Sequence, residues 1–142
     1  MGAPFDFAVS LRIVHPDIDP AVVSAALSMA PKYSWKAGDP RVTPKGNPLG
    51  GTRKESYCTF DVARGGDGEV AERLAEAIER LAEHREFLGK LKATGGSAMF
   101  YVFWYPNGDT GEIFGADLLA QMGRLGIDLG LNVFDDRQND EA

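Results

Sequence analysis

Hydrophobic and polar side chains alternate over residues 5–14, near the start of the chain. Phe5, Phe7, Val9, Leu11 and Ile13 share one face, and polar residues share the other. A repeat of two predicts a β-strand with one buried face. The next segment, which begins at Asp19-Pro20 and ends before Pro31, has the start signal, apolar spacing and stop signal of a helix.

The stretch over residues 33–62 predicts a β-hairpin with an unusually long tip. Tyr33 and Trp35 alternate with polar neighbours, and residues 53–62 alternate again as a returning strand. Between them, Gly38-Asp39-Pro40 is a strong turn signal, and Gly38 is free to adopt positive φ. We expect Trp35 to pack at the base of the hairpin and to determine where the hairpin leaves the sheet.

The repeat becomes helical after a glycine-rich turn at residues 65–68. An apolar stripe predicts a long helix that ends at Gly95-Gly96 and contains Val70, Leu74, Ile78, Leu81, Leu88 and Leu91. Residues 98–105 are apolar on both faces, which predicts a strand that is central or contacts a partner. A short helix around residues 118–125 and an alternating strand over 127–133 complete the pattern.

The predicted order of elements is β-α-β-β-α-β, followed by α-β. The first six elements match the ferredoxin-like arrangement, in which helices cover one face of a mostly antiparallel sheet. We therefore predict an α+β fold with a ferredoxin-like core and a C-terminal α-β unit. The pattern shows no linker and no repeat, so we expect a single domain over residues 1–134 and a frayed acidic tail at 135–142.

The charge and cysteine content restrict the possible partners and the compartment. The net charge of −6 argues against general nucleic-acid binding, which requires a basic footprint. Cys58 is the single cysteine, so no internal disulfide forms and a reducing compartment is suitable. The chain shows neither a signal-peptide pattern nor an apolar run near the ~20 residues that cross a bilayer. We expect a cytoplasmic protein that does not bind membranes.

The sequence contains no recognisable catalytic set. His15 and His84 lie far apart, and neither has a neighbour at metal-ligand spacing. Residues 66–71 match G-x-G-x-x-A after a strand, but Asp67 and Glu69 place negative charge where a bound pyrophosphate would lie. Cys58 lies on the apolar face of its strand, as a buried and unreactive thiol does. We therefore assign no catalytic residue, no cofactor and no metal.

The long hairpin tip concentrates positive charge. Six of the fifteen Lys and Arg residues lie between positions 32 and 54, where Asp39 is the only acid. This asymmetry favours contact with an anionic partner, for which the candidate residues are Trp35, Lys36, Asp39, Arg41, Lys45, Arg53 and Lys54. The alternative is a solvated loop whose charges keep an edge strand from pairing with other chains.

A second candidate surface lies on the strand over residues 98–105. Tyr101 and Phe103 share one face with Met99 and Tyr105. If helices cover only the other face of the sheet, Tyr101 and Phe103 are exposed and mark a binding surface or a homodimer face. The alternative is that the third helix or the hairpin folds over them.

The order of several motifs resembles the bacterial domain of unknown function 4279 family. These motifs are SLRIVHPDIDPAVVSAAL, YSWKAGDP, ESYCTFDV, FLGKLKATG and LLAQMGRLGIDLGLNVF, and they span about residues 8–134. The most distinctive is Trp-Lys-x-Gly-Asp, here Trp35, Lys36, Gly38 and Asp39. The family often carries Trp where this chain has Cys58, so this position is expected to pack differently here.

The resemblance implies a single α+β domain of a cytoplasmic bacterial protein, and it brings no activity, cofactor or catalytic residue. Small bacterial domains of this kind are by analogy compared with immunity or antitoxin-like binding proteins. Our preferred hypothesis is a non-enzymatic binding domain that contacts a protein or an anionic small molecule through the Trp35 hairpin. The alternative is an enzyme or small-molecule carrier with a pocket between sheet and hairpin, where Asp39, Tyr101 and His15 would converge.

Overall fold

The fold combines one main β-sheet with a layer of helices. The computed structural model describes residues 5–106 and 108–134, so the predicted tail at 135–142 lies outside the described residues. In chain order, the elements are β1 (Phe7–His15), α1 (Pro20–Leu27), β2 (Tyr33–Trp35), β3 (Pro40–Val42), β4 (Pro48–Thr52), β5 (Ser56–Gly65), α2 (Val70–Leu81), the 3₁₀ turn η1 (Ala82–His84), α3 (Arg85–Ala93), β6 (Ser97–Trp104), α4 (Ala116–Arg124) and β7 (Ile127–Val133).

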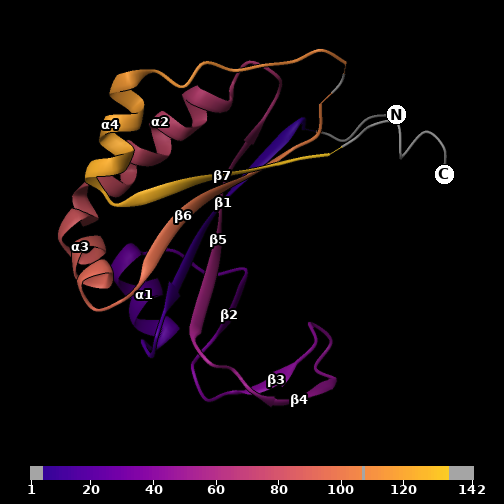
Figure 1. Ribbon diagram of the computed structural model, residues 1–142, viewed down its shortest axis with the longest axis vertical. Coiled ribbons are helices and arrows are strands. Elements are labelled where there is room, and N and C mark those ends of the chain that lie inside the picture. Colours follow the sequence, from indigo (N-terminus) through magenta and orange to yellow (C-terminus); the bar gives the residue numbers. More distant parts are fainter. Residues whose placement is uncertain (1–4, 107, 135–142) are drawn as a thin grey trace.

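The main sheet has five strands in the order β2-β5-β1-β6-β7 (Figure 1). β1 pairs antiparallel with β5 and β6, and β2 pairs antiparallel with β5. Among the described strands, only β6 and β7 pair in parallel. The connection through α4 returns the chain to the end of the sheet at which β6 begins, so β7 runs in the same direction as β6. The structure confirms the predicted α+β class and a mostly antiparallel sheet.

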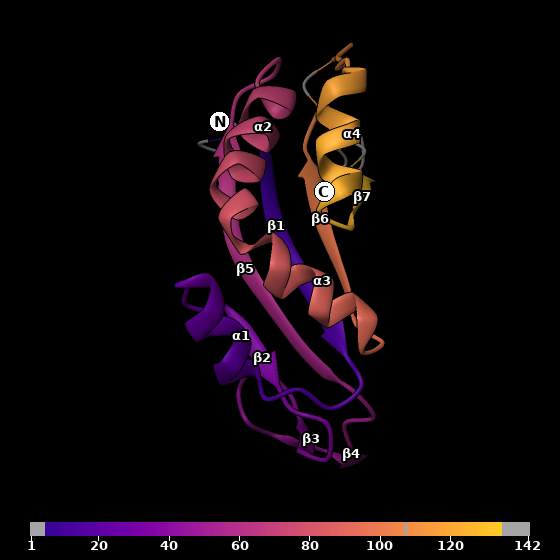
Figure 2. The same ribbon diagram turned by 90° about the vertical axis from the view of Figure 1, so that its left-hand side faces the viewer.

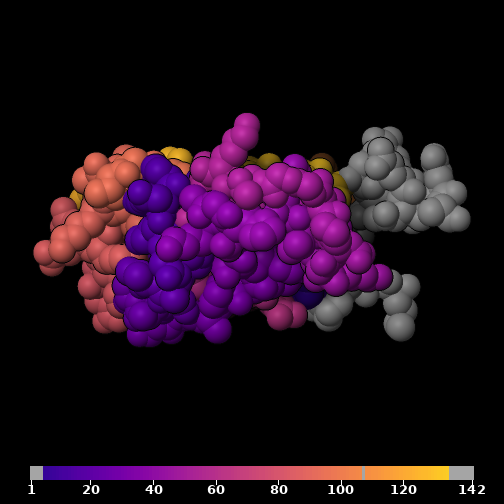
Figure 3. Space-filling model, turned by 90° about the horizontal axis from the view of Figure 1, so that it is seen from below, coloured from indigo at the N-terminus to yellow at the C-terminus, as the bar shows by residue number. Residues whose placement is uncertain are grey.

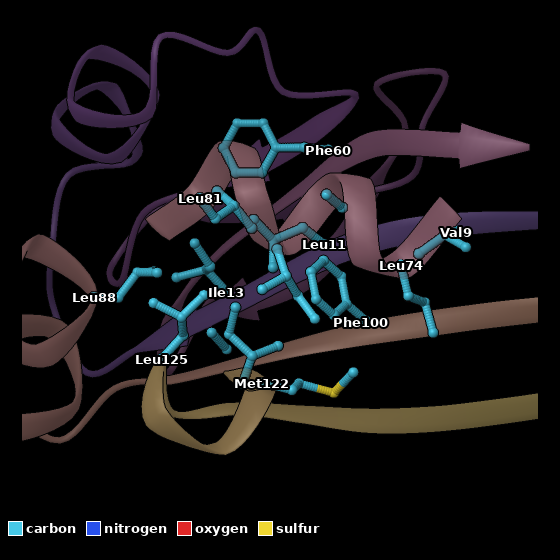
Figure 4. Close-up of a cluster of buried hydrophobic side chains, with 14 of the residues drawn as sticks. Val9, Leu11, Ile13, Phe60, Leu74, Leu81, Leu88, Phe100, Met122 and Leu125 are labelled. Atoms are coloured by element: carbon cyan, nitrogen blue, oxygen red, sulfur yellow. The ribbon is translucent and has the colours of Figure 1, made fainter. Parts of the chain in front are cut away.

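The described helices cover one face of this sheet (Figures 1 and 2). The core lies between the two layers, where Leu11, Phe60 and Phe100 of the sheet are fully buried among side chains that include Leu74 and Leu81 of α2 (Figure 4). Each such side chain contributes about 1.5–3 kcal/mol when it leaves water. The alternating pattern of β1 thus identified the buried face correctly, apart from Phe5.

Phe5 does not continue the buried row. β1 begins at Phe7, and the ring of Phe5 lies edge-on to Tyr105, with 6.3 Å between the ring centroids. Tyr105 follows the exposed side of β6, so Phe5 belongs to the opposite face of the sheet from Phe7. The prediction that Phe5 shares a face with Phe7 is wrong, because a strand's alternation applies only where its ladder continues.

The predicted long helix is divided into α2 and α3 by the 3₁₀ turn η1. The two helices run in different directions across the sheet (Figure 2). A tightened turn redirects a helix axis, and here Leu81 before the turn and Leu88 after it are both buried. A straight helix of this length would diverge from the twisted sheet beneath it.

Residues 33–62 form paired strands, as predicted. Tyr33, Ser34 and Trp35 of β2 pair with Thr59, Cys58 and Tyr57 of β5. The connecting residues 36–55, which we call the arm, contain the separate two-stranded ribbon β3-β4. The arm leaves the end of the sheet and bends away from the helices (Figure 1).

Candidate functional site

The base of the arm is built on a stack of side chains around Trp35. Its indole lies against the ring of Tyr57, its partner across the β2-β5 ladder, with ring centroids 4.6 Å apart and an interplanar angle of 26°. The guanidinium carbon of Arg53 lies 3.8 Å from the centroid of the Trp35 ring. Such cation–π and aromatic contacts hold side chains in a defined geometry.

Backbone hydrogen bonds join the two ends of the arm next to this stack. The amide of Gly38 donates to the carbonyl of Arg53 at 2.8 Å, and the amide of Arg53 donates to the carbonyl of Asp39 at 2.8 Å. The Asp39 carboxylate accepts from the amide of Lys36 at 2.9 Å, while Gly38 takes a φ of 92°. Asp39 therefore forms a turn, as its side chain is suited to do, and its role here is to shape the arm.

Arg53 also connects the stack to the ribbon. Its Nη2 donates to the carbonyl of Val42 in β3 at 3.0 Å. Its Nε is buried and has no hydrogen-bond partner among the described residues. Arg53 is half-buried, so it serves as a structural link between Trp35 and β3.

The remaining arm cations point into solvent. Lys36, Arg41, Lys45 and Lys54 are exposed, and no carboxylate of the described residues lies within 4.0 Å of their charged nitrogens. Viewed from this end, the arm and α1 form one continuous surface (Figure 3). The positive charge predicted from the sequence is therefore gathered on one end of the molecule.

A concave surface of about 750 Å³ lies between the ribbon and the sheet. Its lining includes Trp35, Tyr57 and Arg53, together with residues of the ribbon. Tyr33 and Leu49, on opposite sides of it, are 51% and 50% exposed. Apolar side chains exposed next to unpaired cations are typical of a surface that a partner covers.

Tyr101 and Phe103 of β6 lie on the sheet face opposite the helices, which we call the open face, whereas Phe100 and Trp104 of the same strand are buried in the core. Tyr101 and Phe103 contact each other edge to face, with 5.0 Å between their centroids. The guanidinium carbon of Arg12 lies 3.9 Å from the Tyr101 ring centroid and 5.5 Å from that of Phe103. Both rings are half-buried, and Phe103 also lies against Phe134, with 6.3 Å between the ring centroids. Neither α4 nor the arm crosses this face of β6 (Figure 1).

Strand register places Trp35 and Tyr101 on the same face. Trp35 pairs with Tyr57, which in turn pairs with Val14 of β1. Ser10, four residues before Val14 in the same strand, pairs with Tyr101. Residues an even number apart on one strand share a face. The stack around Trp35 and the rings of Tyr101 and Phe103 therefore lie on the same open face, at different positions along it. Sequence reasoning treated them as separate candidates, because it could not determine which strands are neighbours.

Tyr57 and Arg12 belong to these clusters but were missed from the sequence. Tyr57 alternates with Cys58 and therefore had to face away from the core, which was a usable signal. Arg12 had the same signal on β1. What was lacking was the order of the strands, which alone brings Arg12 beside Tyr101 and Tyr57 beside Trp35.

The groups assigned to an enzymatic pocket do not converge. Asp39 lines the concave surface under the ribbon, whereas Tyr101 contacts Arg12 further along the sheet. His15 is 6% exposed; its Nδ1 accepts from the amides of Asp17 and Ile18, and its Nε2 lies 2.8 Å from the Thr94 hydroxyl. These contacts give His15 a structural role at the end of β1.

Cys58 and the acidic side chains also show no catalytic arrangement. Cys58 is 1% exposed, and burial raises the pKa of its thiol to about 11. Among residues 5–106 and 108–134, no group of three His, Cys, Asp or Glu side chains is placed to hold a metal ion. In the same residues, no helix has the length and apolar character required to span a bilayer.

Comparison with known proteins identifies one family. A family model described as a domain of unknown function (DUF4279) matches residues 5–135. No curated protein matches the chain significantly, and no solved structure does so either. The match covers nearly all of the described structure, including the arm and the open face.

Proposed function

Because this chain belongs to the DUF4279 family, whose description states no activity, we propose a function from its surface alone. The protein is a non-enzymatic binding domain, and the arm binds an acidic segment of a partner protein. The observation that carries this proposal is the Trp35 stack, which holds the ribbon and its exposed cations in place beside a concave apolar surface.

The charges of the arm would attract and orient such a partner. Lys36, Arg41, Lys45 and Lys54 have no ion-pair partner among the described residues, so an incoming carboxylate would not have to displace one. Long-range attraction of this kind raises association rates and selects against basic partners. The carboxylates of α2, on Glu72, Glu76 and Glu79, lie at the other end of the molecule from the arm and would not oppose this approach (Figures 1 and 2).

The apolar part of the arm would supply the short-range contact. Leu49 and Tyr33 are half-exposed beside Trp35 and Tyr57. Interfaces depend mainly on a few desolvated aromatic, aliphatic and Arg contacts, surrounded by polar groups. A partner segment that carries a large apolar side chain between acidic residues fits this arrangement.

Charge reversal tests the proposal. The probe is a short fluorescent peptide of glutamates around two leucines, and binding is measured by anisotropy at several salt concentrations. We expect the triple variant Lys36→Glu/Arg41→Glu/Lys45→Glu to weaken binding by about tenfold or more and to flatten its salt dependence.

The matched control reverses three exposed cations on the helix side: Arg85→Glu/Lys90→Glu/Arg124→Glu. This variant has the same net charge as the arm variant and is expected to bind the peptide nearly as well as the unaltered protein. Equal losses in the two variants would show that the peptide responds to net charge alone, and would contradict a site on the arm.

The concave surface also supports a second candidate, an anionic small molecule held near Trp35 and Arg53. Its volume of about 750 Å³ lies within the range of known ligand pockets. Replacement of Leu49 by Ser distinguishes the candidates. It would weaken a partner segment that spans the ribbon, whereas a small ligand seated on Trp35 would keep its affinity.

We also propose that β1, β2, β5 and β6 form a ferredoxin-like core to which α4 and β7 are added. The strand order β2-β5-β1-β6 and the antiparallel pairing of these strands support this assignment. A cytoplasmic location is likewise a proposal, which the buried free thiol of Cys58 supports because such thiols suit a reducing compartment.

A further inference from the structure

We propose that the open face carries a second, independent site, which binds a small planar aromatic anion. The site is a groove of about 530 Å³ beside the irregular pairing of β1 with β5. The register shifts between Val9 and Ser10, which pair with Ala63 and Asp61 and leave Val62 as the extra residue. Bulges of this kind redirect side chains and are frequent beside functional sites.

Ser10 at this bulge has an unsatisfied hydroxyl. Its side chain is only 7% exposed and lines the groove, and its Oγ has no hydrogen-bond partner among the described residues. A buried hydroxyl without a partner costs free energy that a bound polar atom would recover. The Oγ atom itself is buried beneath the groove, so this cost indicates a ligand only together with the rings and cations around it.

Aromatic rings form the walls of the groove. Phe103 lines it from β6, Tyr105 from the residue after β6, and Phe5 from the segment before β1. Phe5 and Tyr105 meet at an interplanar angle of 65°, so their rings do not cover each other's faces. One face of Tyr105 is already stacked on Phe134, with 4.6 Å between the ring centroids and an interplanar angle of 12°. A planar ligand would therefore contact the ring edge of Tyr105 and the rings of Phe5 and Phe103.

The charges at the edge of the groove favour an anion. Arg64 is exposed, and its guanidinium carbon lies 5.2 Å from the centroid of the Phe5 ring. Lys32 lies 3.9 Å from Asp61, and this exposed pair is weak in water. Two cations and one carboxylate therefore line the groove, and the anionic group of the ligand would lie near Arg64.

The size and surroundings of the groove favour a small molecule over a nucleic-acid strand. A volume of about 530 Å³ accommodates a fused ring system or a mononucleotide. A polyanion crossing the sheet would have to pass Asp61 and Asp128, which is exposed and pairs with Met99 of β6. Repulsion at these two points opposes a long phosphate backbone.

Titration of the intact chain with 2-naphthoate and, separately, adenosine monophosphate tests the site by amide NMR. Both probes combine a planar ring system with an anionic group, which is a carboxylate in naphthoate and a phosphate in adenosine monophosphate. Comparison of the two therefore shows which anionic group the site prefers. We expect saturable shifts at residues 8–10 and 61–64 with at least one probe, and about fivefold weaker binding of the neutral analogue, 2-naphthalenemethanol or adenosine.

Two variants and a matched control locate the contacts. Arg64→Met is expected to weaken binding of the anionic probe about fivefold and to leave binding of the neutral analogue unchanged. Ser10→Ala is expected to weaken binding of the anionic probe and of the neutral analogue. Arg85→Met removes an exposed arginine of α3 and is expected to change neither. The unbound spectrum of each variant shows whether the fold is intact.

Two results would overturn this site. One is the absence of saturable shifts at the bulge with both anions. The other is an equal effect of Arg64→Met and Arg85→Met in folded protein. The Trp35→Ala variant should still bind naphthoate, so failure of the arm proposal and failure of this one are separate results.

Discussion

Trp35 shows how far a single residue can be interpreted from sequence. Its position before a turn signal in a basic segment predicted an anchor for the arm, and the structure places it against Tyr57 and Arg53. The identity of these two partners depends on the register of β2 against β5, which no local pattern determines. Asp39 illustrates the converse, because its turn-forming hydrogen bond was predictable and leaves it a poor candidate for ligand contact.

Truncation of Trp35 tests its role as an anchor. Trp35→Ala removes both the stack on Tyr57 and the contact with Arg53, and should lower the free energy of unfolding by roughly 1–3 kcal/mol. Hydrogen exchange should rise most in β3 and β4, because Arg53 would lose its support. Tyr33→Ala, at a half-exposed position of the same strand, is the control and should have a smaller effect. Equal exchange in the two variants would contradict the anchor role.

Cys58 gives a pH-dependent prediction. Burial raises the pKa of its thiol to about 11 in the folded protein, above the value of about 8.5 expected in the unfolded chain. The unfolded state therefore loses its proton first, and stability present below about pH 8.5 should fall by up to about 1.4 kcal/mol per pH unit as the pH rises towards 11.

Urea unfolding between pH 8 and 10.5 measures this effect, and Cys58→Ala should show a flatter profile. In the native protein the thiol should react with Ellman's reagent only as fast as the chain opens. Rapid reaction at neutral pH, without loss of structure, would contradict the buried position of Cys58.

At the scale of elements, the start of α2 shows how one side chain organises a helix end. The carboxylate of Glu69 accepts a hydrogen bond from the amide of Gly66 at 2.6 Å and pairs with Arg73 at 3.4 Å. The hydrogen bond from Gly66 is the main cause that lowers the pKa of Glu69, and Arg73 adds to it. Glu69, whose negative charge disfavours a bound pyrophosphate at this turn, therefore stabilises the turn through its hydrogen bond with Gly66.

Substitution of Glu69 by Gln tests this contribution. Since the pKa of Glu69 is lowered by folding, its stabilising effect is present at neutral pH and is lost as the pH falls below the unfolded value of about 4.3. The variant should melt at a lower temperature at pH 7, and the difference should shrink at acid pH. Glu72→Gln, on an exposed side chain of the same turn, serves as control. A constant difference at all pH values would show that the ionised carboxylate is not responsible.

At the scale of the whole molecule, the sequence predicted the elements and the buried face well. It predicted less well which elements lie side by side. Alternation within β1 is a local property, so Leu11 was correctly placed in the core. The meeting of Arg12 with Tyr101, and the bulge under Ser10, depend on which strands lie side by side. The break at η1 was also missed, since it reflects the twist of a sheet made from distant segments.

Independence of the arm from the core is a prediction at this scale. In the described structure, no residue between Leu27 and Cys58 belongs to the buried hydrophobic core. Replacement of residues 39–52 by Asn-Gly should therefore leave a folded five-stranded sheet. The amide spectrum of β1, β5 and β6 should be retained, while binding of the acidic peptide should be lost. Collapse of the spectrum would show that the arm is needed for folding.

The central position of β1 has a consequence for the order of events on the ribosome. β1 is synthesised before both of its neighbours, β5 and β6, which are encoded far downstream. The edge of β1 that pairs with β6, from Phe7 to Val14, remains unpaired until Trp104 has emerged, because contacts between distant segments form only after the intervening chain exists. A nascent chain that stops at residue 96 therefore leaves one whole edge of β1 unpaired, and a chain that stops before β5 leaves both edges unpaired.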